Sequence, residues 1–404
     1  MDPQVAVPQS KLADRIAIAV MVSGGLWMSF VFMAIGPVLS TMAGSLTGGL
    51  PGDWVAQLTM TMPDIGIILG GPLAGWLIEK FGLRFVAISA FVLFGFSGSA
   101  GYFIDDGRWM LATRLILGFA GAGITTSTTA LIASRFSGYA RAKAFGYWSA
   151  VGALGGIIAA LAAGRVASVA GWHAVFGLYA LVFISAVAAT LSLPNARNAV
   201  HAVRSASASL VHLWPVFLVM LPIYVATVMS GIQISFLLQA DGIMDPLGQS
   251  WVIATAATGS MVGAWSFGRM QEMLGSKWTF MCFTGLLGVA NFIMPASNVA
   301  WIIAVGAGLN GMGGGMANPY FSTLLVERTP LQAHGRVIGL YVTTMFTGSF
   351  LNPFLIMPLK TSVGIHGAFI VVGANMLAIG VLSVAFKHLP WVTAGRAYLC
   401  ANDA

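Results

Sequence analysis

The sequence is poor in charge: charged residues make up 8% of its 404 positions, with 19 basic and 12 acidic side chains. Soluble proteins carry about a quarter of their residues as charges. Because so few charges cannot cover a chain of this length with a water-facing surface, soluble multidomain and disordered proteins are excluded. The basic residues are dispersed and form no stripe, so nucleic acid is excluded as a partner.

Cysteines and reactive clusters are equally scarce. The two cysteines, Cys282 and Cys400, supply no disulfide framework. The six histidines lack metal-ligand spacing, no nucleophile stands beside a base, and the glycine-rich stretches lack the lysine of a phosphate-binding loop. We therefore expect no metal, no cofactor, no enzymatic activity and no ATP-driven pumping by this chain. A non-transporting receptor would need a sizeable extramembrane module, which the sequence does not contain.

Hydrophobic residues, by contrast, make up 58% of the chain and form long continuous runs. A helix of roughly 20 apolar residues crosses the hydrocarbon core of a bilayer. The runs are continuous rather than alternating, which is not the pattern of a membrane β-barrel. The sequence therefore predicts an all-α membrane protein surrounded by the lipid bilayer, with twelve transmembrane helices near residues 17–41, 54–78, 86–104, 109–131, 145–163, 174–193, 215–238, 250–268, 279–296, 300–325, 336–357 and 366–386.

The positions of lysine and arginine indicate the orientation of these spans. With the N-terminus inside, fifteen of the 19 basic residues fall on the cytoplasmic side, and the exceptions are Arg108, Arg114, Arg165 and Lys360. Both termini are therefore expected in the cytoplasm, in the plasma membrane (inner membrane) of a bacterium. The longest polar break completes the predicted organisation: a cytoplasmic N-terminus (1–16), a six-helix bundle (17–193), a cytoplasmic linker (194–213), a second six-helix bundle (214–390) and a cytoplasmic tail (391–404).

A short motif occurs once in each half. After the second span the chain has Gly75, Glu79, Gly82 and Arg84, and after the eighth span it has Gly268, Glu272, Gly275 and Lys277 at the same spacing. Equal placement in both halves indicates two structural repeats related by an axis along the membrane normal.

Twelve spans in two sixes, with this motif between spans two and three, resemble the major facilitator superfamily (MFS). The family motif is matched by Gly75, Glu79, Lys80, Gly82 and Arg84, and Leu83 departs from it by removing one basic residue. A second family motif is matched in the fourth span by Arg114, Gly118 and Ala122, with Leu117 in place of the usual glutamine.

The resemblance implies that the motif loop, with its repeat at Gly268 to Lys277, forms a cytoplasmic gate. Its glycines would permit close backbone approach, and Glu79 would interact with the positive N-terminal end of the eleventh span, near Arg336. The alternative is a solvated turn that only follows the positive-inside rule. We favour the gate because the pattern recurs in both halves.

The second half carries neutral polar groups within its spans. Asn310, Asn318 and Pro319 suggest a broken stretch of the tenth span that lines a cavity, because hydrocarbon penalises unpaired amides and carbonyls. With Gln233 and Asn352, the two asparagines form the predicted substrate cavity. Contacts between helices would use the same residues equally well.

Only two charges lie deep within predicted spans, Asp64 in the second and Arg114 in the fourth. Ionised groups at mid-bilayer cost several kcal/mol, so each should face a cavity or a partner. We predict that both residues serve proton coupling, with Arg114 approaching Asp64 in one state of the transport cycle and leaving it in another. The alternatives are a static pair, or an arginine bonded to backbone carbonyls.

These features together predict a monomeric secondary active transporter that moves a small organic solute by alternating access, coupled to protons. We favour export of amphiphilic compounds because the spans are strongly apolar and the second half has no embedded charge. The alternative is proton-coupled uptake of an organic anion or another metabolite, with Arg114 receiving a carboxylate.

The charge distribution gives a direct test of orientation. A single cysteine at Ser207, in the predicted linker, should resist a membrane-impermeant thiol reagent added to intact cells and react after the cells are opened. Labelling of intact cells at full extent would contradict a cytoplasmic linker.

Overall fold

The computed structural model describes residues 11–46, 51–193, 210–330 and 333–385. Most of the predicted linker, the predicted tail and the first ten residues therefore lie outside the described residues. Within those ranges the chain is helical and contains no strand, which confirms the predicted all-α class. The α-helices are α1 (Lys11–Met33), α2 (Leu39–Ala43), α3 (Gly52–Phe81), α4 (Leu83–Ser99), α5 (Gly107–Arg135), α6 (Gly138–Gly177), α7 (Val182–Ser192), α8 (Trp214–Thr227), α9 (Met229–Ile232), α10 (Ile234–Ala240), α11 (Pro246–Ile293), α12 (Ala300–Glu327) and α13 (His334–Ala385).

The described helices include eight segments that are long and apolar enough to cross a membrane. Three of them run for 50 or 51 residues. A straight helix of that length would measure about 75 Å, more than twice the thickness of the hydrocarbon core. Each of the three contains one glycine in the left-handed region, at Gly171 (φ 78°), Gly275 (φ 73°) and Gly364 (φ 75°). The chain changes direction there, in a backbone conformation that other residues adopt only with strain.

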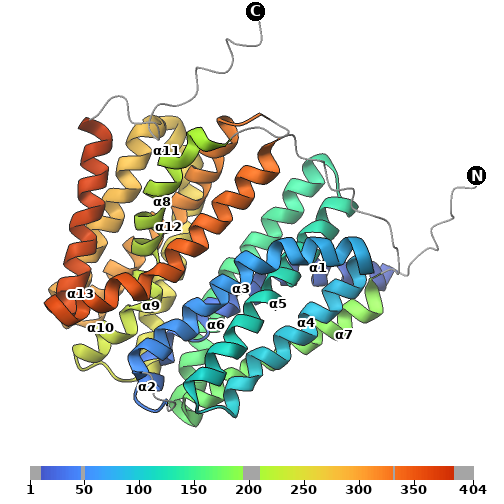
Figure 1. Cartoon of the computed structure of the whole chain (residues 1–404), viewed down its shortest axis with the longest axis horizontal. Helices are drawn as coiled ribbons and strands as arrows, with labels where there is room; N and C mark the ends of the chain where they lie inside the picture. Colours follow the sequence, from blue (N-terminus) through green and yellow to red (C-terminus); the bar gives the residue numbers. More distant parts are fainter. Residues whose placement is uncertain (1–10, 47–50, 194–209, 331–332, 386–404) are drawn as a thin grey trace, which may run out of the picture.

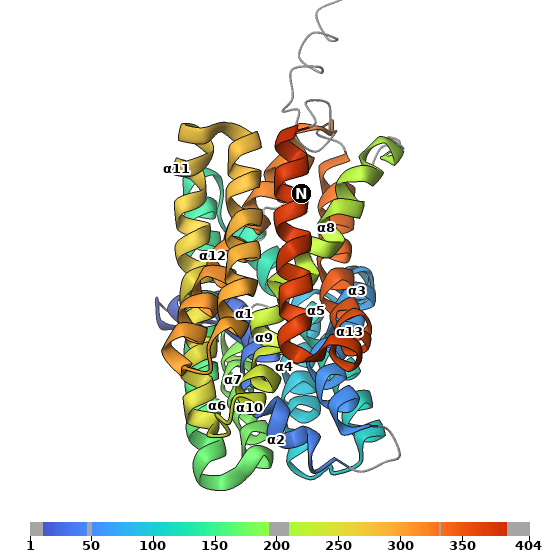
Figure 2. The same ribbon diagram turned by 90° about the vertical axis from the view of Figure 1, so that its left-hand side faces the viewer.

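The helices form two groups on either side of the break at 194–209. Figure 1 shows α1–α7, the first helix group, on one side and α8–α13, the second helix group, on the other. Figure 2 shows the long helices of the second group running along a common direction. Three-residue and four-residue 3₁₀ turns join several of the helices, among them Gly36–Val38 between α1 and α2.

The internal repeat extends from the loop motif to the packing of the helices. In the first group α3 contacts α5 so closely that a Cβ at Gly66 would lie 2.3 Å from the Leu115 carbonyl oxygen. In the second group, 193 positions later, a Cβ at Gly259 of α11 would lie 2.0 Å from the Gly308 oxygen of α12. A second contact repeats with the same offset: a Cβ at Gly118 would meet the Pro63 oxygen at 2.1 Å and one at Gly311 the Ala256 oxygen at 1.9 Å.

These glycine contacts hold α3 against α5 and α11 against α12, backbone to backbone. Small residues are what allow helices to approach each other this closely in a membrane. The glycines of α6 make most of their close contacts inside the first group. Gly152, Gly155 and Gly156 of α6 face α1, and Gly164 faces Ser250 of α11.

We expect Gly311→Ala to destabilise the protein, because its methyl group would overlap a carbonyl oxygen that belongs to a packed helix. Overpacking of this kind costs about 1–3 kcal/mol. Thermal unfolding in detergent should therefore show a lower Tm for Gly311→Ala. The matched control is Gly285→Ala in the neighbouring helix α11, where no atom lies within 4 Å of the added Cβ. Equal Tm values for the two variants would contradict the close helix contact.

Candidate transport site

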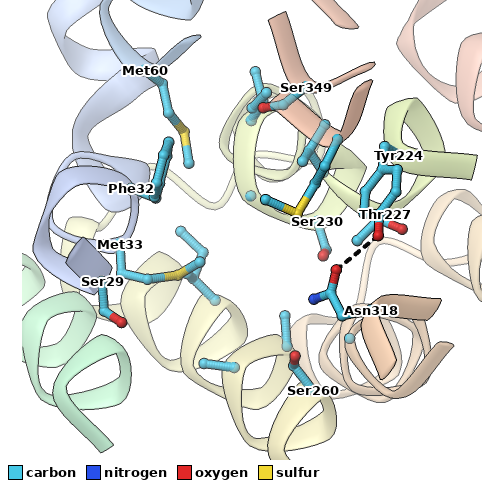
Figure 3. Close-up of a pocket in the computed structure, with 18 of the residues that line it drawn as sticks. Ser29, Phe32, Met33, Met60, Tyr224, Thr227, Ser230, Ser260, Asn318 and Ser349 are labelled. Carbon is cyan, nitrogen blue, oxygen red and sulfur yellow. Dashed lines mark hydrogen bonds between the residues drawn. The ribbon is translucent and has the colours of Figure 1, made fainter. Parts of the chain in front are cut away.

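A cavity of about 340 Å³ lies between the two helix groups. Its wall is contributed by α1, α3, the α8–α9 region, α11, α12 and α13, and Figure 3 shows side chains from all sides pointing toward the same space. Asp, Glu, Lys, Arg and His are all absent from this wall. Its large apolar side chains include Met28, Phe32, Met33, Met60, Met345 and Phe346, and its polar side chains are Ser29, Tyr224, Thr227, Ser230, Ser260, Asn318 and Ser349.

One end of the cavity carries a hydrogen-bonded cluster of Tyr224, Asn318 and Tyr341. The Tyr224 hydroxyl donates to the Asn318 side-chain oxygen at 2.9 Å, and the Tyr341 hydroxyl reaches the same oxygen at 3.1 Å. The two hydroxyls lie 3.1 Å apart. Because the Asn318 oxygen is used by both tyrosines, the amide nitrogen is the group left for the cavity, and Figure 3 places it on the cavity side.

Of the four residues predicted to line the cavity, Asn318 lies in its wall and Gln233, Asn310 and Asn352 do not. These three are fully buried. Asn310 and Asn352 donate to the Ala226 and Val225 carbonyls, each at 3.0 Å. In this structure these three residues make contacts between helices, the alternative given above, and do not line the cavity.

The position of the broken helix is the physical reason for this correction. The break lies in the seventh predicted span, where α8 ends at Thr227 and is followed by the short helices α9 and α10. Unwound backbone at membrane depth must be satisfied by the protein, and the two asparagines supply donors to the carbonyls next to the break. The tenth span, where the break was expected, is the continuous helix α12, which runs through Pro319.

Asp64 of α3 lies behind the cavity wall. It is completely buried, and neither carboxylate oxygen accepts a hydrogen bond from any residue that the structure describes. Met60, one helical turn before Asp64, lines the cavity, whereas Asp64 itself is absent from the cavity wall.

Arg114 of α5 is also completely buried but faces a different neighbour. Its Nη2 donates to the carbonyls of Ser97 and Gly98, near the end of α4, at 2.9 and 2.8 Å. The guanidinium carbon lies 4.9 Å from the ring centre of Phe176 and 5.3 Å from that of Tyr179. Arg114 and Asp64 form no ion pair within the described residues. In this structure Arg114 is therefore bonded to backbone carbonyls, which is one of the alternatives given for it.

The predicted gate residues occupy corresponding places in the two groups. Gly82 and Gly275 have left-handed φ values of 86° and 73° at the turns. The basic residue two positions later binds the last turn of a neighbouring helix: Arg84 donates to the Thr190 carbonyl at 2.6 Å, and Lys277 donates to the Val384 carbonyl at 2.8 Å. A cation at a helix C-terminus satisfies carbonyls that the helix leaves free.

The remaining gate residues are open to solvent or lipid in this structure. Glu79 and Glu272 are exposed, and neither has a recorded ion pair among the described residues. Gly75 and Gly268 have no atom within 4 Å of the position of a Cβ, so the close backbone approach expected there is not present. Lys80 lies over the Trp76 ring at 4.9 Å. The end of the molecule that carries Glu79 is therefore not held closed by these residues.

The opposite end, which carries Asp53, joins the two groups through several contacts. Lys360 of α13 bonds Asp53 of α3 at 2.5 Å and lies 4.9 Å from the Phe236 ring centre. Nearby, Gln233 donates to the Gln57 side-chain oxygen at 2.8 Å, and the Trp54 and Phe354 rings meet at 5.5 Å. The sequence did not reveal this closure, because Asp53 and Lys360 are 307 residues apart and neither stands in a motif.

Comparison with known proteins now identifies the fold. The family model described as Major Facilitator Superfamily matches residues 16–240 and 216–395, which together cover most of the sequence. The chain belongs to the major facilitator superfamily. It is thus a multi-pass membrane protein of a family of secondary transporters.

Two MFS relatives share part of its sequence. The multidrug efflux pump Tap of Mycolicibacterium fortuitum is 24% identical over 145 residues, 36% of this chain and 36% of the pump. The methylenomycin A resistance protein of Bacillus subtilis (strain 168) is 24% identical over 178 residues, 42% of this chain and 36% of that protein. The matches span little more than a third of the length of these relatives.

Solved MFS structures share the fold over nearly the whole chain. A peptide transporter POT in complex with sulfate superimposes with a TM-score of 0.77 at 12% identity, over 94% of this chain and 96% of that one. The inward-open xylose transporter XylE from E. coli gives 0.72 at 12% identity, over 94% and 97%. At this identity the likeness concerns the fold alone.

We expect Lys360→Gln to loosen the end that carries Asp53. The pair is partly exposed, so its loss should cost about 1 kcal/mol or less and change the ratio of closed to open molecules by up to about fivefold. Spin labels at the exposed Val169 and Met244, one in each group near this end, should show a longer mean distance by electron paramagnetic resonance. The charge-swapped double variant Asp53→Lys with Lys360→Asp should restore the wild-type distribution. Identical distances in wild type and Lys360→Gln would show that the Lys360–Asp53 pair does not hold this end closed.

Proposed function

We propose that this MFS protein exports uncharged or weakly charged amphiphilic compounds by alternating access, driven by protons. The observation that carries the proposal is the cavity between the two helix groups, whose wall combines methionine and phenylalanine side chains with neutral hydrogen-bonding groups. Methionine is flexible and polarisable, so it adapts to solutes of different shape. A wall without fixed charge favours apolar solutes with few polar groups.

The proposed topology is twelve transmembrane helices in two six-helix bundles. Splitting the three longest segments at Gly171, Gly275 and Gly364, and adding α12, gives that number from the eight apolar segments. The lysine and arginine distribution supports cytoplasmic termini in a bacterial inner membrane, with the end of the molecule that carries Asp53 facing outward. We propose that the protein functions as a monomer, with the solute and protons as its ligands.

The contacts between the groups support alternating access. They join the groups at the Asp53 end, whereas at the Glu79 end the hydrogen bonds of Arg84 and Lys277 stay within their own helix groups. A transporter must form the opposite arrangement in another state, and Glu79 would then meet the second group. The proposed gate at Gly75 to Arg84 and at Gly268 to Lys277 acts in that second state.

The relatives support export rather than uptake. One is named a multidrug efflux pump and another a resistance protein, although each match covers a limited part of the chain. The alternative of organic-anion uptake required Arg114 to receive a carboxylate. Arg114 is absent from the cavity wall and is bonded to carbonyls of α4, so no observation favours that alternative.

Asp64 is the proposed proton site. It is the one fully buried carboxyl group within the described residues, and its helix α3 packs against α13 of the second group. A carboxyl group there is exposed to different surroundings as the groups move. The proposal assigns no direct proton transfer to Arg114, which instead supports the first group that positions Asp64.

Asp64→Asn should abolish gradient-driven accumulation in proteoliposomes while allowing solute exchange at equal concentrations, because an amide cannot carry a proton across. The matched control is Asp106→Asn, which keeps a good N-cap for α5 in a loop away from the cavity and should transport normally. Full uphill transport by Asp64→Asn at neutral pH would refute the proton role.

A further inference from the structure

Asn318 is a polar side chain whose two ends face different surroundings. It is exposed, although it lies within α12, well before the end of that helix at Glu327. Gly311 and Asn318 are about two helical turns apart, so they lie on the same face of α12, and both line the cavity. Figure 3 shows the Asn318 amide at the edge of this space. The exposed part of Asn318 therefore faces the cavity.

Two buried tyrosines hold the amide oxygen of Asn318. Tyr224 of α8 and Tyr341 of α13 donate their hydroxyls to this oxygen at 2.9 and 3.1 Å. Because both donors lie behind the wall, the amide is held with its nitrogen toward the cavity, as Figure 3 shows. The nitrogen carries two donor hydrogens, and no acceptor for them is recorded among the described residues. The wall thus presents an oriented hydrogen-bond donor.

The hydroxyl groups of the wall do not offer a donor of fixed direction. Thr227 donates its proton to the Ile223 carbonyl at 2.9 Å. Ser230 donates its proton to the Asn310 side-chain oxygen at 2.8 Å, so both hydroxyls present lone pairs to a solute. A serine hydroxyl that is free to turn serves as donor or acceptor and does not select between them. Asn318 is therefore the wall residue whose bonds fix a donor toward the solute.

We propose that Asn318 selects the solute by donating its amide hydrogens to a hydrogen-bond acceptor, and that the transported compounds are uncharged amphiphiles with a carbonyl or ether oxygen beside an apolar body. The proposal rests on the proposed function and names the substrate class within it. The methionine and phenylalanine side chains of the wall adapt to the apolar body, and Asn318 binds the oxygen. Tyr341, which is absent from the wall, is a positioning residue that acts through Asn318.

An amide donor in an apolar wall discriminates by the cost of leaving it unpaired. A solute without an acceptor displaces water from Asn318 and gives nothing in return, whereas a solute with a carbonyl replaces the bond to water. A site built to form a hydrogen bond rejects an analogue that lacks the partner atom more strongly than an apolar site rejects a change of shape. The cavity should therefore tolerate different shapes while requiring an acceptor.

The test uses 2-acetylnaphthalene and 2-isopropenylnaphthalene, in which a methylene group replaces the carbonyl oxygen. Binding of the two radiolabelled compounds to purified full-length protein in detergent is measured by equilibrium dialysis, with protein-free micelles as the reference. We expect wild type to bind the ketone about tenfold more tightly than the alkene, equivalent to about 1.4 kcal/mol. Equal affinities, or tighter binding of the alkene, would overturn the proposal.

Four variants complete the experiment, and thermal unfolding verifies that each is folded. Asn318→Leu and Asn318→Ala remove the donor at two side-chain sizes and should bind the two probes equally. Tyr341→Phe removes one bond to the amide oxygen without changing the wall, so the ketone preference should fall to about threefold while the alkene binds as in wild type. The matched control is Asn375→Leu, because Asn375 is an exposed amide of α13 that lines a separate hollow of about 540 Å³. It should keep the wild-type preference.

The outcomes separate this proposal from the proposed function, because binding at equilibrium needs neither a gradient nor a direction of transport. A wild-type preference in folded Asn318→Leu or Asn318→Ala would overturn the role of Asn318. Loss of the preference in Asn375→Leu would place the probe in the separate hollow and overturn the assignment to the cavity. An unchanged preference in Tyr341→Phe would overturn the positioning role.

Two further outcomes concern the proposed function itself. The expected ketone preference, together with full uphill transport by Asp64→Asn, would overturn the proton role and leave selection by Asn318 standing. Binding of neither probe by wild type would overturn both proposals, because the cavity would then not accept an uncharged amphiphile.

Discussion

The requirement that every polar group inside a membrane find its partner within the protein governs this structure. Lipid offers no hydrogen bonds, so each break in a helix and each buried charge must be satisfied by another side chain or carbonyl. Asn310 and Asn352 supply donors at the break after α8, and Arg114 takes carbonyls near the end of α4. Asp64 differs from Arg114, which leaves Nε and Nη1 without a partner but bonds through Nη2, because both Asp64 oxygens lack a hydrogen bond within the described residues. We therefore expect the surroundings of the Asp64 carboxyl group to differ between this structure and a second state of the protein.

The fold could be predicted from the sequence to the extent that it follows from hydrophobicity and repetition. The apolar runs near 54–78 and 300–325 correspond to α3 and α12, and the repeated motif marks turns with the same left-handed glycines at Gly82 and Gly275. Such features depend on neighbouring residues in the chain and on the thickness of the bilayer. These features can therefore be predicted from the sequence without knowing which helices are in contact.

The site was less accessible to prediction, because its partners are distant in sequence. The sequence draws attention to Asp64, Arg114 and the amides of the second half, since polar groups in apolar runs are costly. It could not tell that Arg114 faces α4 rather than Asp64, although α3 and α5 are in contact, because the side of a helix on which a residue lies depends on packing. Serines such as Ser349 give no signal at all, since a hydroxyl is easily satisfied by the carbonyl of its own helix.

The helix contacts repeat at an offset of 193 residues, but the buried charged side chains on those helices do not. The position that corresponds to Asp64 in the second group is Ala257, and the position that corresponds to Arg114 is Ala307. The two groups thus share a scaffold but differ in their buried polar side chains: the first holds Asp64 and Arg114, and the second holds Gln233, Asn310 and Asn352. The two groups therefore share their backbone packing but not the buried side chains placed on it, so neither group could take the place of the other.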